Sequence, residues 1–299
     1  MGVDDGLALF LADRLMPGLC AVSTVAGNVP LPVATRNALL FRALLGREQS
    51  WPVLTGAGCA SDGFAPDAGA VHGADGLGGA TAAADPAVLA RIAAEPVLPI
   101  AQATPPRAGP VTLIGIGPAT NIPALVTWYG RDRVERIVLM SGVFFDVGNI
   151  TPEAEFNAHS DPAALRATLD LGVTVQLIPL DVCRKIQLSR TALASFGSAH
   201  ATALTRLISA SHVHYMDFYR KWEGIDGCFP HDAITVLAAL EPERFRCLRG
   251  QVTVATVGSE RGKTSVKIDA SSHIEIATGG DLKCVRETIA RELTNPPVA

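Results

Sequence analysis

The sequence predicts an α/β domain with a mostly parallel central sheet that is flanked by helices on both faces, a Rossmann-like architecture. Short β-rich apolar runs alternate with longer helical patterns along most of the chain. The 299 residues are 48% hydrophobic, which is sufficient for one large core. No internal repeat is present, so we expect a single domain over residues 1–299.

Apolar runs of four to seven residues predict strands at Leu19–Val25, Pro52–Thr55, Val111–Ile116, Arg136–Met140 and Val173–Pro179. Helical periodicity around them predicts helices at Gly6–Leu15, Val33–Leu45, Pro86–Ala94, Asn121–Tyr129 and Pro162–Leu171. Asp161 and Pro162 have the residue types of an N-cap and a first helical position.

In the last third of the chain, the alternation of predicted strands and helices stops. Its pattern is helical from about residue 188 to 240, and two short strands at Gln251–Ala255 and Ser265–Ile268 then precede a helix near Leu282–Leu293. One long loop, Gly56–Ala84, is rich in Gly, Ala and Asp, and loops of that length are usually functional. This architecture normally opens with a strand, and we expect that the opening strand is missing here.

Composition narrows the possible partners. The 25 Lys and Arg residues do not outnumber the 29 Asp and Glu residues, so we expect no nucleic-acid partner. The six cysteines are scattered singly, which favours a reducing, cytoplasmic location. We find no signal peptide and no apolar stretch long enough for a membrane span, and therefore expect no membrane association.

Two acidic motifs stand at predicted helix starts. Asp4 and Asp5 precede an apolar helix, and adjacent carboxylates of this kind suit a hard cation or a helix N-terminus. His231 and Asp232 precede the apolar run Ala233–Leu240. Taken alone, each motif is more typical of ordinary helix capping than of a functional site.

A glycine-containing turn follows the strand at Val111–Ile116. Gly115-Ile-Gly-Pro-Ala-Thr120 departs from a dinucleotide fingerprint, because Thr120 replaces the third glycine and Pro118 removes an N–H group. A Rossmann-type cofactor enzyme is therefore disfavoured. The turn does offer backbone carbonyls to a hard cation at the carboxyl edge of the sheet.

A cluster of polar side chains suits a polyhydroxylated ligand. Asn149, Glu155 and Asn157 follow the strand at Arg136–Met140, and sugar hydroxyls need partners that both donate and accept. A turn followed by a solvated helix is the alternative. His72 lies in the long loop. Its side chain either points into a binding site or belongs to a surface turn.

Two other patterns do not support chemistry. His212 and His214 are two residues apart in a helical segment, where they point away from each other, so we interpret them as packing or surface residues. Ser141 lacks the preceding glycine of a nucleophile elbow.

Taken together and in order, these motifs resemble those of the inosine-uridine preferring nucleoside hydrolases. The matching segments span nearly the whole chain: Gly2–Leu9, Thr24–Asn28 with Thr35–Ala38, His72–Gly78, Gly117–Ile122, Gly148–Asn157 with Asp161-Pro162, Leu180–Val182 and His231-Asp232. The resemblance implies the nucleoside hydrolase fold and hydrolysis of the N-glycosidic bond of ribonucleosides, through an oxocarbenium-like transition state. It also implies a Ca²⁺ ion that activates water, and we expect a homo-oligomer, a dimer or a tetramer.

The resemblance also implies site roles. Asp5 and Asp232 would be carboxylate ligands of Ca²⁺, with the Thr120 carbonyl as a third ligand. The ribose and its 5′ hydroxyl would be held by Asp4, Asn28, Asn149, Glu155 and Asn157, with further contacts from His72 and Asp232. His231 would protonate the departing base. These assignments predict that Asp5, Thr120 and Asp232 converge at the carboxyl edge of the sheet.

The sequence departs from the family at its start. The family motif reads Asp-x-Asp-Pro-Gly-x-Asp-Asp, and its second Asp, a calcium ligand and general base, would fall before Met1. Either translation of the natural protein begins upstream of Met1, or the chain is a shortened relative that binds nucleosides or ribose with impaired catalysis. For the chain as given we expect weakened Ca²⁺ binding, low stability and little hydrolysis, with Asp4 as the candidate base if hydrolysis occurs.

Overall fold

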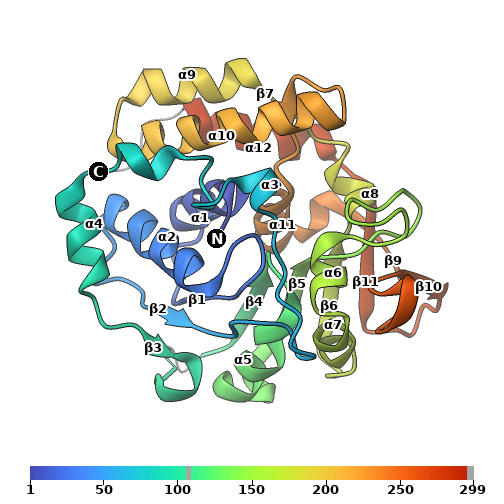
Figure 1. Ribbon diagram of the computed structural model, residues 1–299. Helices are drawn as coiled ribbons and strands as arrows, with labels where there is room; N and C mark the ends of the chain where they lie inside the picture. The colour runs from blue at the N-terminus through green and yellow to red at the C-terminus, as the bar shows by residue number, and fades with distance from the viewer. Residues whose placement is uncertain (106–108, 295–299) are drawn as a thin grey trace.

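A six-stranded mixed sheet is the larger of two sheets at the centre of the structure, a computed structural model that describes residues 1–105 and 109–294 (Figure 1). Its strand order is β10-β9-β11-β6-β5-β4. The strands are β4 (Val111–Gly115), β5 (Val134–Met140), β6 (Thr174–Ile178), β9 (Phe245–Val254), β10 (Thr264–Ile268) and β11 (Ile274–Gly280). Neighbours from β4 to β11 pair in parallel, while β9 pairs antiparallel with both β11 and β10.

A smaller parallel sheet carries the first part of the chain. Its strands are β1 (Val22–Thr24), β2 (Val53–Thr55) and β3 (Leu98–Pro99), in that order. A short antiparallel pair, β7 (Leu188–Ser189) and β8 (Gly227–Cys228), lies outside both sheets. The predicted α/β fold with a mostly parallel sheet is confirmed.

Helices cover both faces of the larger sheet, as β5 shows. Val138 and Met140 pack in a core with α1 (Val3–Leu15), α2 (Leu31–Leu44), α10 (Ala203–Trp222) and α11 (His231–Leu240). Ile137 and Leu139 pack in a second core with α5 (Ile122–Tyr129) and α7 (Pro162–Leu169). Successive side chains of a strand point to opposite faces, so an uninterrupted apolar run fills both cores.

The remaining helices lie around this centre. They are α3 (Gly69–His72), α4 (Pro86–Ala93), α6 (Phe156–Ser160), α8 (Leu180–Cys183), α9 (Arg190–His200) and α12 (Leu282–Thr294). The loop predicted at Gly56–Ala84 therefore contains the single turn of α3, which places His72 in a buried position.

The structure corrects two strand predictions. β11 has no counterpart in the sequence prediction, because it contains Glu275 and ends in Gly279 and Gly280, residues typical of a turn. β9 begins at Phe245 instead of Gln251. The N-cap predicted at Asp161 is confirmed, since its carboxylate accepts the N–H of Ala164.

Candidate active site

Three carboxylates from the two ends of the chain meet at the start of two packed helices. Asp4 and Asp5 lie in the first turn of α1, and Asp232 lies in the first turn of α11. One oxygen from each carboxylate lies within 4.8 Å of the other two. The predicted convergence of Asp5 and Asp232 is thus present in the structure, with Asp4 as a third member of the group.

Burial makes this arrangement electrostatically costly. Desolvation, with the neighbouring charge of Asp5, raises the pKa of Asp4 to about 7. Desolvation and then the charge of Asp4 raise the pKa of Asp232 well above its ordinary value. Burial lowers the pKa of the α-amino group of Met1, which the charges of Asp5, Asp232 and Asp4 oppose. A cation among the carboxylates would offset their repulsion.

Asp5 is held in place by two nitrogen donors. The Asn28 amide donates to Asp5 Oδ2 at 2.9 Å, and the backbone N–H of Gly2 donates to the same oxygen at 2.8 Å. Asn28 follows β1 and Gly2 precedes α1, so the carboxyl end of the small sheet and the helix start are joined here. The second oxygen of Asp5 is not used by these contacts.

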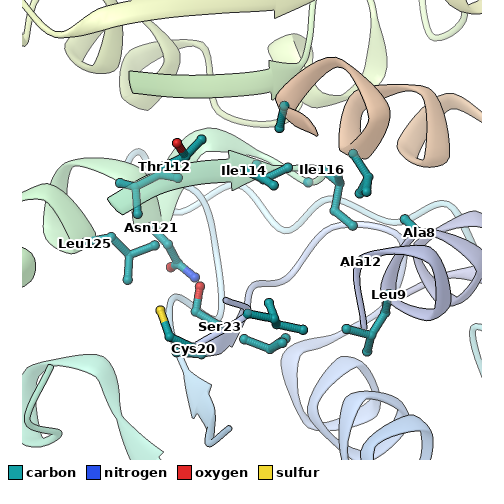
Figure 2. A pocket seen from close by; sticks show the side chains of 18 of the residues that line it. Ala8, Leu9, Ala12, Cys20, Ser23, Thr112, Ile114, Ile116, Asn121 and Leu125 are labelled. Carbon is teal, nitrogen blue, oxygen red and sulfur yellow. The ribbon is translucent and has the colours of Figure 1, made fainter. Parts of the chain in front are cut away.

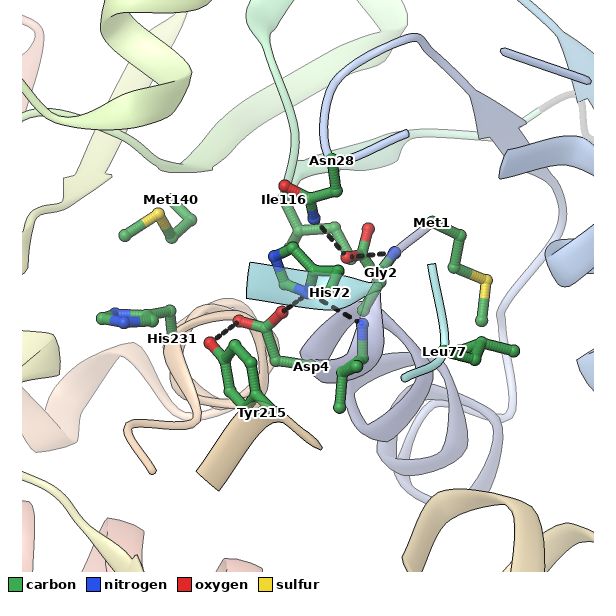
Figure 3. Close-up of polar contacts among 12 residues, drawn as sticks. Met1, Gly2, Asp4, Asn28, His72, Leu77, Ile116, Met140, Tyr215 and His231 are labelled. Carbon is green, nitrogen blue, oxygen red and sulfur yellow. Dashed lines mark hydrogen bonds and ion pairs between the residues drawn. The ribbon is translucent and has the colours of Figure 1, made fainter. Parts of the chain in front are cut away.

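Asp4 is bounded by two aromatic side chains (Figure 3). The Tyr215 hydroxyl donates to Asp4 Oδ2 at 3.2 Å, and His72 Nδ1 lies 3.9 Å from Asp4 Oδ1. The His72 ring stacks on the Tyr215 ring with centroids 5.2 Å apart. Because His72 Nδ1 accepts the N–H of Val3, and burial lowers the pKa of His72 to about 4, the ring is neutral with its proton on Nε2.

His231 pairs with a tyrosine from the neighbouring helix. Its Nε2 lies 2.9 Å from the hydroxyl of Tyr219, and this hydroxyl lies 3.4 Å from that of Tyr215. Burial lowers the pKa of His231 to about 3, so the ring is neutral. Its Nδ1 is buried and has no hydrogen-bond partner among residues 1–105 and 109–294.

Glu155 and Asn157 come together at the start of α6. Glu155 caps this helix and accepts N–H groups of Gly142, Asn157 and Ala158. Its burial raises its pKa to about 7 in spite of these donors. The buried Asn157 amide donates to the Met140 carbonyl at 3.0 Å, at the carboxyl end of β5.

Asn149 lies in the exposed loop before α6. Its side-chain oxygen accepts the N–H of Phe156 at 2.8 Å, which ties this loop to the helix that carries Asn157. Asn149, Glu155 and Asn157 thus belong to one connected segment.

Thr120 lies in the turn between β4 and α5. Its hydroxyl donates to Asp161 at 2.8 Å. This contact does not involve the Thr120 carbonyl, which stays the predicted calcium ligand. At the carboxyl end of β4, Ile116 lines a cavity together with Met1 and Asp5 (Figure 2), and its carbonyl accepts the Asn157 amide at 3.4 Å.

Sequence reasoning missed Tyr215 and Tyr219. They lie four residues apart on one face of α10, so one face of that helix presents both hydroxyls to Asp4 and His231. The signal in the sequence is this spacing, but an aromatic pair on a long amphipathic helix usually means core packing. His212 fits its sequence interpretation as a packing residue, since it is buried and bonds the Ile208 carbonyl.

Comparison with known proteins decides the family. A family model described as inosine-uridine preferring nucleoside hydrolase matches residues 1–287. The chain belongs to this family. It is 32% identical over 280 residues to the probable uridine nucleosidase 2 of Oryza sativa subsp. japonica, covering 89% of this chain and 79% of that protein.

Two further nucleoside hydrolases extend the similarity to almost the full chain. The non-specific ribonucleoside hydrolase RihC of Shigella boydii serotype 18 is 30% identical over 302 residues, covering 98% of this chain and 95% of that protein. The solved plant nucleoside hydrolase PpNRh1 superposes with a TM-score of 0.83 at 26% identity, covering 99% and 96% of the two chains.

This nucleoside hydrolase is a single α/β domain in fold and a hydrolase by family. Its relatives act on ribonucleosides, according to their names. Within residues 1–105 and 109–294, no helix is both long and apolar enough to cross a bilayer.

Proposed function

We propose that this nucleoside hydrolase cleaves the N-glycosidic bond of ribonucleosides to free base and ribose, with Ca²⁺ bound by Asp5 and Asp232 beside Asp4. The observation that carries the proposal is the approach of these three carboxylates to within 4.8 Å of one another. Two of them are buried, and no ordinary helix cap requires three negative charges in one place.

The donor set suits a hard divalent cation. Ca²⁺ prefers six to eight oxygen ligands, and carboxylates and a backbone carbonyl are of the preferred kind. Asp5 and Asp232 would hold the ion, with the backbone carbonyl of Thr120 as a third ligand. When bound, the ion would supply positive charge that makes a nearby water more acidic.

Amide and carboxylate groups around the cluster of Asp4, Asp5 and Asp232 would recognise the ribose. Asn28 and Asn157 present amides from the ends of β1 and α6, and Glu155 and Asn149 belong to the same segment as Asn157. Such groups donate to and accept from sugar hydroxyls. His72 and Asp4 complete the surface on the side of α1.

The leaving base would receive its proton from His231. The Tyr219 hydroxyl lies within hydrogen-bond distance of Nε2 of His231, and the buried Nδ1 of this ring has no hydrogen-bond partner in the described part of the chain. If Tyr219 donates to Nε2, the neutral ring carries its proton on Nδ1, where it is available to a departing base. As Nδ1 gives its proton to the base, Nε2 would take the hydroxyl proton of Tyr219, so that the ring stays neutral and the phenolate is protonated again afterwards.

We propose Asp4 as the general base of the 299-residue chain. The alternative is a catalytically impaired relative that binds nucleosides or ribose.

We further propose a cytoplasmic role in nucleoside salvage as a homo-oligomer. The six cysteines are free in the structure, as a reducing compartment requires. Light scattering of the purified chain would measure the oligomeric state.

The function is tested by incubating the 299-residue chain with uridine, cytidine, inosine and guanosine, with CaCl₂ or with EGTA. Release of free base with CaCl₂, abolished by EGTA, is the expected result for the enzyme. Nucleoside binding in calorimetry without base release would support the impaired relative. Neither binding nor hydrolysis by a folded chain would contradict both.

A further inference from the structure

The segment that joins β5 to α6 carries Asn149 on an exposed part of its course. Residues 141–150 of this segment contain no helix or strand. The apolar side chains of Phe145, Val147 and Ile150 are 67%, 60% and 46% exposed. Burial of these side chains therefore does little to fix the position of Asn149, and polar contacts must do so.

The short helix α8 lies beside this segment and makes the first of these contacts (Figure 1). Asp181 of α8 is buried, and its two carboxylate oxygens accept the N–H groups of Phe144 at 3.0 Å and of Phe145 at 2.6 Å. At the start of the same helix, the N–H of Leu180 donates to the Gly142 carbonyl at 3.1 Å. Both oxygens of Asp181 are thus used to hold the backbone of one segment.

Arg184 makes the second contact, one helical turn after Asp181. Its Nη1 donates to the Val147 carbonyl at 2.5 Å and lies 3.3 Å from the carboxylate of Asp146. The Arg184 side chain is only 18% exposed, and a hydrogen bond from a charged donor is stronger than one between neutral groups. Because Val147 precedes Asn149 by two residues, Arg184 fixes the backbone immediately before Asn149.

The other side of Asn149 is fixed by the turn that leads into α6. The N–H of Asn149 donates to the Ala154 carbonyl at 3.2 Å, and its side-chain oxygen accepts the N–H of Phe156 at 2.8 Å. Neither contact uses the NH₂ group of the Asn149 side chain. This group is therefore the one that Asn149 can offer to a ligand.

The same helix lies near His231, the proposed general acid. After burial, the positive charge of Arg184 is the largest cause of the low pKa of His231. Such an effect requires proximity, because the interaction between charges weakens with distance. α8 also packs against α11, the helix that begins at His231. The segment that α8 holds therefore borders the site to which His231 belongs.

We propose that Asp181 and Arg184, the α8 clamp, are positioning residues for the ribose 5′ hydroxyl. The clamp holds residues 142–147, so that the NH₂ group of Asn149 meets the 5′ hydroxyl oxygen without first having to order the segment. Asp181 and Arg184 touch no reacting atom and act through Asn149. The inference rests on the proposed function, in which Asn149 recognises ribose.

An ordinary surface ion pair explains this arrangement less well. Asp146 is 41% exposed, and exposed ion pairs contribute little to stability. Such a pair requires neither the hydrogen bond from Arg184 to the Val147 carbonyl nor the two hydrogen bonds to Asp181. All of these contacts hold backbone groups of one segment, as expected for a preorganised binding loop.

Removing the 5′ hydroxyl from the substrate isolates the effect of the clamp. Arg184→Ala and the unsubstituted chain are compared with uridine and 5′-deoxyuridine in saturating CaCl₂, by kcat/KM, or by Kd from calorimetry if no base is released. We expect Arg184→Ala to weaken the value for uridine about fivefold, the effect of one lost hydrogen bond, and that for 5′-deoxyuridine less than about twofold. Arg184→Lys retains a donor for the Val147 carbonyl and should recover most of the loss.

Two further comparisons distinguish positioning from general destabilisation. Arg131→Ala also removes a guanidinium from backbone carbonyls, those of Leu171 and Gly172, and should leave the values for both nucleosides unchanged. In a chain that already carries Asn149→Ala, Arg184→Ala should cause no further loss for uridine, because the side chain that it positions is absent.

Equal losses for uridine and 5′-deoxyuridine would overturn the proposal, and so would losses from Arg184→Ala and Asn149→Ala that add. If Arg184→Ala does not fold, Asp181→Asn, which keeps one acceptor for the segment, is measured in its place with the same expected preference. A folded, unsubstituted chain that binds neither nucleoside would contradict the proposed function together with this inference. Binding with equal losses for the two nucleosides would contradict this inference alone.

Discussion

Tyr219 and His231 are joined by a contact of 2.9 Å between the phenol oxygen and Nε2, although they belong to different helices. The ring is buried and neutral, since burial lowers its pKa to about 3. A neutral histidine can donate a proton only if its other nitrogen carries one. The tyrosine therefore selects which nitrogen faces the departing base.

Removing His231, or the Tyr219 hydroxyl that orients its proton, should slow the reaction for poor leaving groups. Loss of a general acid costs about 10²–10⁴-fold, so His231→Ala should lower kcat for inosine and uridine by that range. Tyr219→Phe, which removes one hydrogen bond, should lower it by about tenfold. A p-nitrophenyl riboside needs no proton and should be affected little. Tyr129→Phe, whose hydroxyl contacts Cys20, is the matched control. Equal losses for both substrate types would argue against proton donation.

The carboxylate cluster should respond to Ca²⁺ in the absence of substrate. Binding to the folded state alone raises its stability, so CaCl₂ should raise the melting temperature. Asp232→Asn removes one of three converging carboxylates and should weaken binding by at least about tenfold, as fewer charged ligands lower affinity. Calorimetric titration measures this directly. Asp132→Asn, at an exposed site, should bind as the unsubstituted chain does. A Ca²⁺ affinity unchanged by Asp232→Asn would place the ion elsewhere.

Substitution of Asp161 should lower the stability of the fold rather than the rate of the reaction. Its carboxylate accepts the N–H and the hydroxyl of Ser61, the hydroxyl of Thr120 and the N–H of Ala164. Asp161→Ala would leave these donors unpaired at a buried position, and we expect a loss of about 3 kcal/mol in the free energy of unfolding. Asp67→Ala, an exposed residue that accepts the N–H of Gly69, should cost about 0.5 kcal/mol. Urea unfolding compares them, and similar losses would refute the prediction.

The sequence anticipated those parts of the fold and site that have local signatures. β5 ends in a continuous apolar run from Ile137 to Met140, and the pairs Asp4-Asp5 and His231-Asp232 stand at helix starts where their carboxylates are readily placed. β11 was missed because its stability comes from pairing with β6 and β9, distant in the chain, and not from its own composition.

Two features of the site lie beyond sequence patterns for other reasons. A backbone carbonyl carries no side-chain signature, so the residue types in the turn after β4 do not by themselves identify a carbonyl ligand. Tyr215 and Tyr219 have the spacing of a buried helix face, and only the approach of α10 to α1 and α11 shows that their hydroxyls meet polar groups.

Acid should destabilise the protein through its buried histidines, and His212 isolates the effect. Burial lowers its pKa from 6.5 to about 4, so the unfolded chain takes up a proton that the folded chain refuses between these values. Stability is therefore lost as pH falls from 6.5 toward 4, by about 3 kcal/mol for this group. His212→Phe keeps a ring beside Tyr215 and should lose less stability over that range. His273→Phe, at an exposed site, is the control and should lose as much stability over this pH range as the unsubstituted chain. The same loss in His212→Phe would contradict the assignment to His212.

The last prediction distinguishes the effect of an added N-terminal strand on stability from the effect of the general-base aspartate that the family motif carries at its end. Two extended chains are compared, each with an apolar strand before Met1. One strand ends in Asp-x-Asp in the family's register, and the other ends in Asn-x-Asn. Both should raise the melting temperature, because an added apolar strand would cover part of the cavity that Leu9, Ser23 and Leu125 line. Only the first should restore rapid hydrolysis, since a positioned general base contributes about 10²–10⁴-fold. Turnover with saturating CaCl₂, at matched folded fractions, measures the difference. If the 299-residue chain hydrolyses nucleosides as fast as the Asp-x-Asp extension, no upstream carboxylate is needed, and Asp4→Asn should then abolish the activity.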